Sequence, residues 1–248
     1  MMDPPLVFDL DGTLLRSDLL VETGLLYLRD QPHRFWAPLL WVMGGKAALK
    51  YRLADATDLD VTLLPYDDAV IALIDSERQS GRRIVLATAS QRRLAERVAA
   101  HLGLFDEVLA TDTQRNLSAG AKRDALVERY GERGYDYAGN AAEDLTVWQA
   151  ARWAYVVNAS GSVLRRARRQ GNVHRVLGPA DASMHDWLRA LRLHQWLKNL
   201  LIFVPLLTAH LYGEPELVGK GLLAFLSFSL CASSVYLLND LLDLPDDR

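Results

Sequence analysis

The stretch Val7-Phe8-Asp9-Leu10-Asp11-Gly12-Thr13 decides the fold of the first part of this 248-residue chain. Residues 5–10 predict a short buried strand, and Gly12 breaks it into a loop. The two carboxylates point into that loop, so one can attack phosphorus while the other moves a proton. A calcium loop would need further oxygen ligands at alternate positions, and Leu14 and Leu15 supply none. The stretch therefore favours phosphoryl transfer at the end of a strand.

Composition sets broad limits on the class of protein. The net charge of -3 indicates no particular partner, and we expect no nucleic acid to bind. The single cysteine, Cys231, excludes an intramolecular disulfide framework and a cysteine zinc site, and it fits a reducing compartment. Residues 1–5 lack the basic and apolar regions of a signal peptide, so we expect the N-terminal part to be cytoplasmic.

Short apolar strands and amphipathic helices alternate after residue 64. Strands are expected at 5–10, 83–87, 107–110, 135–138 and 154–157, with helices at 65–78, 91–102, 121–130 and 144–152. This alternation predicts an α/β fold with a Rossmann-like parallel sheet covered on both faces. Residues 174–177 are a candidate edge strand. Residues 17–64 have a helical pattern without strands, with Ser17 as the expected N-cap of a helix over 18–30, and predict a helical insertion.

Polar residues follow several of these strands. Ligands of parallel sheets bind beyond the carboxyl ends of the strands, where Asp9, Thr88 and Asn140 are expected. The Thr88 hydroxyl can contact a phosphate oxygen, and Lys122, at the start of a helix, can neutralise charge in the transition state. Residues 139–144 supply oxygen ligands suited to Mg²⁺.

In this order, the four elements resemble the haloacid dehalogenase-like hydrolases over residues 5 to about 158. The resemblance implies that Asp9 is the nucleophile, which forms an aspartyl-phosphate, and that Asp11 is the general acid/base. It implies that Thr88 and Lys122 bind the phosphoryl oxygens. The insertion at residues 17–64 would be the helical cap of this family.

The resemblance also implies a magnesium site. Its ligands would be Asp9, the backbone carbonyl of Asp11 and Asn140, with Asp144 supporting them. The family usually has aspartate where this chain has Asn140, so the site loses one negative charge. Two interpretations follow: an active Mg²⁺-dependent phosphatase, which we favour, or a non-catalytic regulatory module on a membrane anchor.

Other conspicuous residues each allow two interpretations. Phe35, Trp36 and Trp41 could grip a lipid-like substrate, but packing in the cap core is favoured. Ser90 could assist phosphate binding, but an N-cap for the helix at 91–102 is favoured. The arginine run at residues 165–169 suits anionic lipid and a solvated helix face equally.

The last quarter of the chain is more apolar. We expect a domain over residues 1–177, a linker at 178–185 and an incomplete all-α transmembrane region at 186–248. Residues 187–198 predict an amphipathic helix at a membrane surface. Residues 200–211 are too few to span a bilayer, whereas 222–238 are uncharged and near the lower limit for a spanning helix. The alternative is a pair of helices buried in a soluble protein.

Acidic residues follow this apolar segment. On a continuing helix, Asn239, Asp243 and Asp246 line one face, and Asp240 and Asp247 can lean in from the side. Such a face can hold a diphosphate through Mg²⁺, although a solvated helix end has the same pattern. Residues 192–199 and 233–243, with the apolar segment between them, resemble the start of UbiA-type membrane prenyltransferases. The resemblance is greatest to the branch that moves phosphoribosyl from phosphoribosyl diphosphate to decaprenyl phosphate. It implies that the acidic residues belong to the first aspartate-rich motif and that Lys198 contacts phosphate.

Several transmembrane helices and the second aspartate-rich motif of that family are not in this sequence. We therefore expect a fragment of a larger fusion, multi-pass in the membrane, with the N-terminal domain in the cytoplasm. Transferase activity is not expected from these 248 residues alone. The expected partners are membrane lipid and a phosphorylated small molecule or polyprenyl-linked phosphomonoester. A plain two-helix anchor remains an alternative for the C-terminal part.

Overall fold

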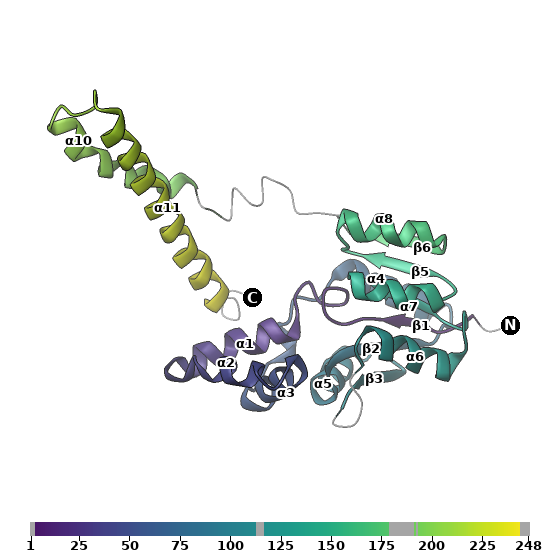
Figure 1. Cartoon of the computed structure of the whole chain (residues 1–248). Helices are drawn as coiled ribbons and strands as arrows, with labels where there is room; N and C mark the ends of the chain where they lie inside the picture. The colour runs from purple at the N-terminus through teal and green to yellow at the C-terminus, as the bar shows by residue number, and fades with distance from the viewer. Residues whose placement is uncertain (1–2, 113–116, 179–190, 192, 244–248) are drawn as a thin grey trace. The chain divides into compact units, whose positions relative to one another are not determined.

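The computed structural model describes residues 3–112, 117–178, 191 and 193–243. The chain divides into two compact units, residues 1–181 and 182–248, each of which is described by itself. The division falls inside the predicted linker, most of which lies outside the described residues. Figure 1 shows the elements of each unit.

A six-stranded parallel sheet forms the centre of the first unit. Its order is β3-β2-β1-β4-β5-β6. The strands are β1 (Leu6–Phe8), β2 (Ile84–Gln91), β3 (Glu107–Thr111), β4 (Asp136–Gly139), β5 (Ala154–Val157) and β6 (Val173–Leu177). The strand order reverses at β1, which pairs with both β2 and β4, and a crevice for ligands forms at such a switch point. The prediction of a parallel α/β sheet is confirmed, as is the edge strand at 174–177.

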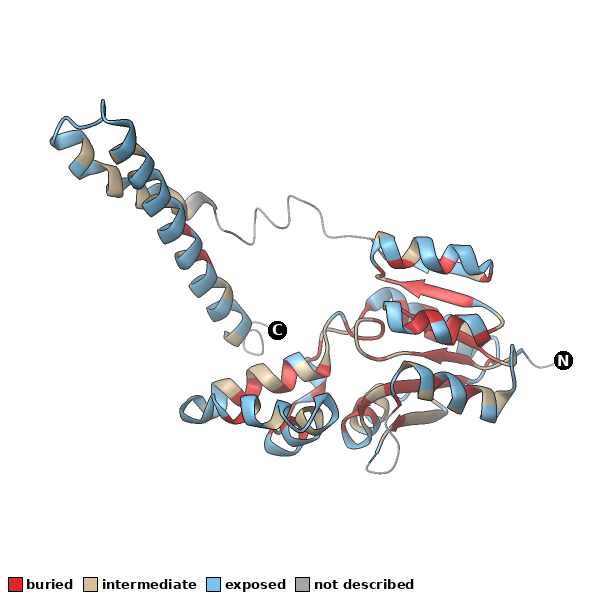
Figure 2. Cartoon of the chain, viewed as in Figure 1, coloured by how far each residue is buried: buried red, intermediate tan, exposed pale blue. Residues whose placement is uncertain are grey.

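Helices cover both faces of this sheet, as Figure 1 shows. On one face, α4 (Asp68–Gln79) and α5 (Arg92–Leu102) pack against Leu6 and Phe8. On the other, α6 (Ala119–Tyr130), α7 (Leu145–Ala150) and α8 (Gly161–Gln170) pack on the side that carries Val7. Successive strand residues face opposite layers, so both sets must be apolar in the central strands β1, β2, β4 and β5, which are mostly buried (Figure 2). The edge strands β3 and β6 are less buried.

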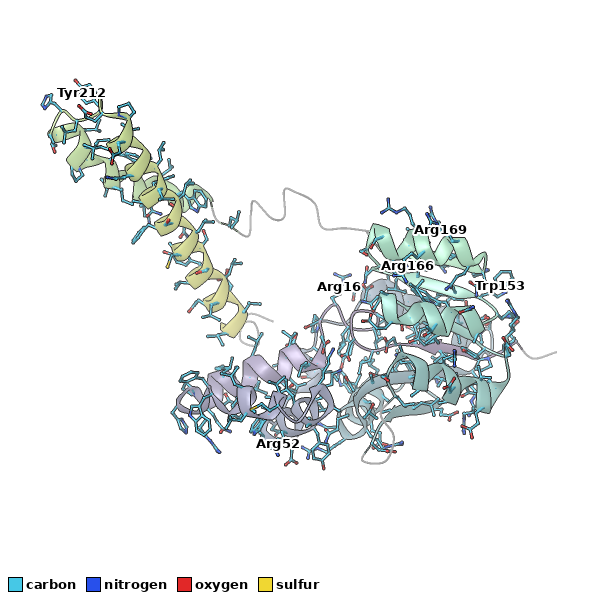
Figure 3. All side chains as sticks on the ribbon, in the orientation of Figure 1. Arg16, Arg52, Trp153, Arg166, Arg169 and Tyr212 are labelled. Atoms are coloured by element: carbon cyan, nitrogen blue, oxygen red, sulfur yellow. The ribbon has the colours of Figure 1, made fainter. Side chains whose placement is uncertain are left out.

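Several predicted boundaries were wrong by a few residues. Helix α4 begins at Asp68 rather than at residue 65, because the Asp67 carboxylate accepts hydrogen bonds from the Ala69 and Val70 N–H groups. Strand β2 continues to Gln91, so Thr88 lies within the strand and not after it. The arginines of α8 lie on its exposed face, where Figure 3 labels Arg166 and Arg169.

The insertion after β1 is helical, as predicted. It contains α1 (Leu19–Asp30), a 3₁₀ turn (Pro32–Arg34), α2 (Ala37–Val42), α3 (Lys46–Ala56) and a second 3₁₀ turn (Val61–Leu63). The N-cap of α1 is Asp18 and not Ser17, because the Asp18 carboxylate accepts from the Leu20 N–H at 2.7 Å. Trp41 packs edge-on against Tyr27, so its assignment to the cap core is confirmed. The same assignment was wrong for Phe35 and Trp36, which are 63% and 48% exposed.

The second unit contains a 3₁₀ segment (Leu193–Phe203), α10 (Val204–Thr208) and the long helix α11 (Pro215–Asp243). Trp196 Nε1 donates to Ser233 Oγ at 3.0 Å, and Asn199 Nδ2 donates to Ser229 Oγ at 2.9 Å, so small polar residues join the two segments. Among the described residues, one helix, Pro215–Leu242, is long and apolar enough to cross a membrane. Most of the predicted surface helix at 187–198 lies outside the described residues.

Candidate active site

A cavity of about 800 Å³ opens between the carboxyl ends of the strands and the cap. Asp9 and Asp11 reach it from the loop after β1, and Asn140 reaches it from the loop after β4. Lys122 enters from the first turn of α6. Helix α3 supplies the cap side of the cavity, through Lys46, Ala47, Ala48, Lys50, Tyr51 and Arg52. The sheet and the cap thus enclose one site, and its lining residues come from segments that are far apart in the sequence.

Asp9 lines the cavity, and its hydrogen bonds use one of its two carboxylate oxygens. In the described part of the chain, its hydrogen bonds come from Lys122 Nζ at 2.8 Å and from the Leu10 N–H at 2.9 Å, and both end on Oδ1. Burial raises the pKa of Asp9 to about 7, against the opposing effect of Lys122. Oδ2 accepts neither of these two hydrogen bonds, so it is the oxygen suited to nucleophilic attack.

Asp11 has a different environment. Its Oδ1 accepts from the Leu19 N–H at 2.9 Å, and its Oδ2 accepts from Ser90 Oγ at 2.6 Å. Burial raises the pKa of Asp11, and Asp18 raises it further. A carboxyl whose pKa is raised stays protonated closer to neutral pH, which is the state that a general acid needs.

A buried network fixes Lys122 in place. Its Nζ donates to Tyr137 Oη at 2.9 Å, and Tyr137 in turn donates to Asp144 Oδ1 at 2.9 Å. Burial by itself would lower the pKa of Lys122, but the negative charges of Asp9 and Asp144 raise it, so the side chain is a cation. Lys122 can therefore neutralise charge on a phosphoryl group bound beside Asp9.

Asp144 organises the loop after β4. Its Oδ2 accepts from the Asn140 and Ala141 N–H groups, both at 3.0 Å, while Oδ1 is bound to Tyr137. Because both oxygens have protein partners, Asp144 positions the loop. Its support of a magnesium site stays a prediction.

Asn140 packs directly over Gly12. The φ angle of Gly12 is +74°, and a Cβ atom there would lie 2.1 Å from Asn140 Nδ2. A side chain at this position would therefore be strained and would also collide with Asn140. Thr13 Oγ1 donates weakly to Asn140 Oδ1 at 3.5 Å, so the two loops contact each other through this amide.

Thr88 and Ser90 differ from what their sequence positions predict. Thr88 is fully buried, and its Oγ1 accepts from the Ser90 N–H at 3.0 Å, so its contact with phosphate stays a prediction. The preferred reading of Ser90 as an N-cap was wrong, because the N-cap of α5 is Gln91 and the Ser90 hydroxyl binds Asp11. Ser90 lies two residues after Thr88 in the same strand, and this spacing could have indicated that Ser90 belongs to the site.

The cap contributes a residue that the sequence reasoning missed. Lys50 Nζ lies 3.7 Å from Asp11 Oδ2, and both side chains are largely buried. Tyr137 was also missed, because an aromatic residue in a buried strand resembles ordinary core packing. The pattern of a helical insertion alone does not show which of its lysines faces the sheet.

The oxygen donors at the cavity suit Mg²⁺ by type. Among the described residues, no three His, Cys, Asp or Glu side chains are arranged to hold a metal ion. The expected set, however, contains a carboxylate (Asp9), a backbone carbonyl (Asp11) and an amide (Asn140), all from residues that line one cavity. The carboxylates of Asp9, Asp11 and Asp144 also concentrate negative charge there, so the donor chemistry fits a small divalent cation.

The residues predicted to bind diphosphate lie in the second unit. Asn239, Asp240 and Asp243 fall in the last turns of α11, and Asp247 lies outside the described residues. Lys198 lies beside a small hollow of about 50 Å³ that Trp196, Ser233 and Tyr236 also line. The structure therefore does not test whether these groups form one site.

Comparisons with known proteins agree with the geometry of the first unit. The family model for haloacid dehalogenase-like hydrolases matches residues 6–147. A protein of unknown function from Bordetella pertussis Tohama I has a similar fold, with a TM-score of 0.57 and 16% identity over 72% of this chain and 99% of that one.

Two curated relatives extend the comparison toward the C-terminus. Uncharacterized protein y4nM of Sinorhizobium fredii (strain NBRC 101917 / NGR234) is 37% identical over 98% of this chain and 47% of its own length, so the chain spans about half of that relative. Decaprenyl-phosphate phosphoribosyltransferase of Mycolicibacterium smegmatis is 37% identical over 75 residues, 29% of this chain and 24% of the relative. With a family model that matches more than half of its residues, the chain belongs to the haloacid dehalogenase-like hydrolases.

Proposed function

We propose that the first unit is a Mg²⁺-dependent phosphomonoester hydrolase that acts through an aspartyl-phosphate. The observation that carries this proposal is the pairing of two carboxylates in different environments at one cavity. Asp9 is bound to the Lys122 cation at 2.8 Å, whereas Asp11 is bound to the Ser90 hydroxyl and the Leu19 N–H. Two carboxyl groups with such different partners at one cavity suit a nucleophile and a general acid.

The proposed reaction has two steps. Asp9 Oδ2 attacks phosphorus, the bond from phosphorus to the alcohol oxygen breaks, and Asp11 gives its proton to that oxygen. Asp11 then removes a proton from water, whose oxygen attacks phosphorus, and this releases inorganic phosphate and restores the Asp9 carboxylate. Lys122 stabilises the phosphoryl oxygens throughout. Mg²⁺, held by Asp9, the Asp11 carbonyl and Asn140, would neutralise phosphate charge.

A phosphate-release assay tests this proposal against the non-catalytic alternative. Purified chain is incubated with Mg²⁺ and a broad panel of phosphomonoesters, beside an Asp9→Asn variant. Release of phosphate that Asp9→Asn abolishes supports catalysis. No release across the panel would favour a regulatory module, for which the amide at Asn140 is the motivating feature.

For the second unit we propose part of a UbiA-type membrane transferase. Support comes from the similarity to decaprenyl-phosphate phosphoribosyltransferase and from the apolar helix Pro215–Leu242. Because the chain spans about half of its relative y4nM, a larger fusion protein is proposed, multi-pass in the membrane with its hydrolase domain in the cytoplasm. Replacing Asp240 and Asp243 in the complete protein should abolish transfer, and unchanged transfer would favour a plain anchor.

The two proposed activities fit one reaction sequence. Transfer of phosphoribosyl from its diphosphate to a polyprenyl phosphate leaves a phosphomonoester on the lipid-linked product, and an adjacent hydrolase can remove it. We therefore propose a polyprenyl-linked phosphomonoester as the substrate. Incubating the chain with polyprenyl-phosphoryl phosphoribose in detergent should release phosphate in an Asp9-dependent manner. Release from small phosphomonoesters alone would keep the hydrolase and reject this substrate.

A further inference from the structure

The end of the cap carries an exposed apolar surface that the catalytic site does not use. Met43, Leu39 and Phe35 are 83%, 65% and 63% exposed, and three neighbours within residues 35–43 are about half exposed. We define the cap tip as these six residues: Phe35, Trp36, Leu39, Leu40, Val42 and Met43. Figure 2 shows helix α2 and the turns beside it as mainly exposed. Clustered apolar exposure of this kind marks a surface that binds a partner.

The cap tip is not needed to hold the cap together. The apolar core of the cap is formed by Tyr27, Ala37 and Leu53, with Trp41 packed against Tyr27. Ala37 and Trp41 thus form the inner side of α2, and the tip residues alternate with them on the outer side. The segment therefore has one face for the cap and one face without a protein partner in the described chain.

Charge identifies the partner. Residues 31–54 contain no aspartate or glutamate, and they contain Arg34, Lys46, Lys50 and Arg52. Lys46, Lys50 and Arg52 line the active-site cavity, although Lys46 and Arg52 are also exposed, as Figure 3 shows for the labelled Arg52 on α3. Arg34 is exposed directly beside Phe35 of the cap tip and does not line that cavity. Aromatic and aliphatic residues bordered by cations are typical of segments that lie in the interface of an anionic bilayer.

We propose that the cap tip docks on a membrane containing anionic lipid. The tip residues would enter the acyl boundary, while Arg34 contacts lipid headgroups. The same chain contains an apolar helix long enough to cross a bilayer, which would keep the first unit near that surface. Docking is independent of whether the site hydrolyses phosphomonoesters, so its test does not require activity.

Environment-sensitive fluorescence tests the docking in the full chain. The single native cysteine is removed by Cys231→Ser, and Leu39→Cys is labelled with nitrobenzoxadiazole; Val176→Cys, on the exposed edge strand β6, is the matched control. Vesicles of phosphatidylcholine with phosphatidylglycerol should shift the Leu39-site emission to the blue, and doxyl-labelled lipid should quench it. The Val176-site emission should not change. Arg34→Glu should weaken the response about tenfold or more.

Separate outcomes overturn the proposal or isolate its parts. An unchanged Leu39-site signal in anionic vesicles overturns the proposal. A blue shift that appears without lipid and grows with protein concentration also overturns it, because it indicates that a second copy of the chain covers the cap tip. A label at Leu223→Cys, on the exposed surface of α11, reports the proposed span separately. If that label is not quenched, the span proposal fails, while the Leu39 site still reports docking to the added vesicles.

Discussion

Lys50 on helix α3 places its Nζ atom 3.7 Å from Oδ2 of Asp11, so a cation of the cap contacts the proposed general acid of the sheet. The two residues are separated by a helical hairpin, and only the folded cap brings them together. Lys50 lowers the pKa of Asp11 against the larger effect of burial, which raises it. The cap is therefore part of the electrostatic environment of the catalytic carboxyl.

Replacing Lys50 should change the pH dependence of hydrolysis. In Lys50→Met the pKa of Asp11 rises further, so its acid form persists to higher pH. The alkaline limb of the kcat/KM profile therefore moves to higher pH. The measurement is a pH–rate profile on an alkyl phosphate, whose leaving group needs a proton. Lys46→Met is the control. Lys46 also lines the cavity, and we expect its replacement to leave the pH profile in place. Equal shifts in both variants would contradict the pairing.

Removing Lys122 should cost most of the activity. Lys122→Met leaves Asp9 and Asp144 without the cation that lies between them, so the pKa of Asp9 rises above its value of about 7. We expect kcat to fall by roughly 10²–10³ or more, since an electrostatic partner of the transition state is lost. Lys122→Arg should recover part of this loss, which a merely structural role would not explain. Steady-state kinetics with near-neutral and alkaline buffers would check both effects.

Changing Asn140 to aspartate should strengthen magnesium binding. The Asn140→Asp carboxylate adds a negative charge to the proposed ligand set without adding volume above Gly12. The Mg²⁺ concentration for half-maximal activity should fall by about tenfold, which corresponds to about 1.4 kcal/mol. Magnesium titration of phosphate release measures this, with Asn140→Ala as the variant that should bind Mg²⁺ less well. An unchanged titration in Asn140→Asp would remove residue 140 from the ligand set.

Protonation of Asp67 should make the first unit less stable in acid. Burial opposes the shift, but the bonds from Asn158 Nδ2 and Arg16 Nε lower the pKa of Asp67 below its ordinary value. A lowered folded-state pKa contributes stability that is complete above the unfolded value near 4 and is lost as pH falls through the folded value.

Asp67→Asn measures that contribution directly. The variant keeps a side-chain N-cap for α4 but loses the charge, so we expect it to be about 1 kcal/mol less stable at neutral pH. Urea unfolding in detergent, followed by the fluorescence of buried Trp148, should show this difference shrinking below pH 4. A difference that stays constant between pH 7 and pH 3 would contradict the assignment.

The sequence predicted the elements better than their ends. Short apolar runs such as Ala154–Val157 are strands wherever both faces of a sheet are covered, so their pattern was sufficient. Boundaries depended on single hydrogen bonds, such as those that Asp67 and Asp18 accept, and composition does not reveal which of two adjacent polar residues caps a helix.

The sequence by itself determined the parallel α/β class, the helical insertion and the two carboxylates after β1, because each depends on local pattern and on spacing within one segment. The tertiary structure decided which distant side chains meet those carboxylates. It placed Ser90 and Lys50 on Asp11, and Tyr137 between Lys122 and Asp144. It also left Phe35 and Trp36 exposed where packing in the cap core was predicted. These relationships depend on how separate segments pack, and no local pattern of residues encodes that packing.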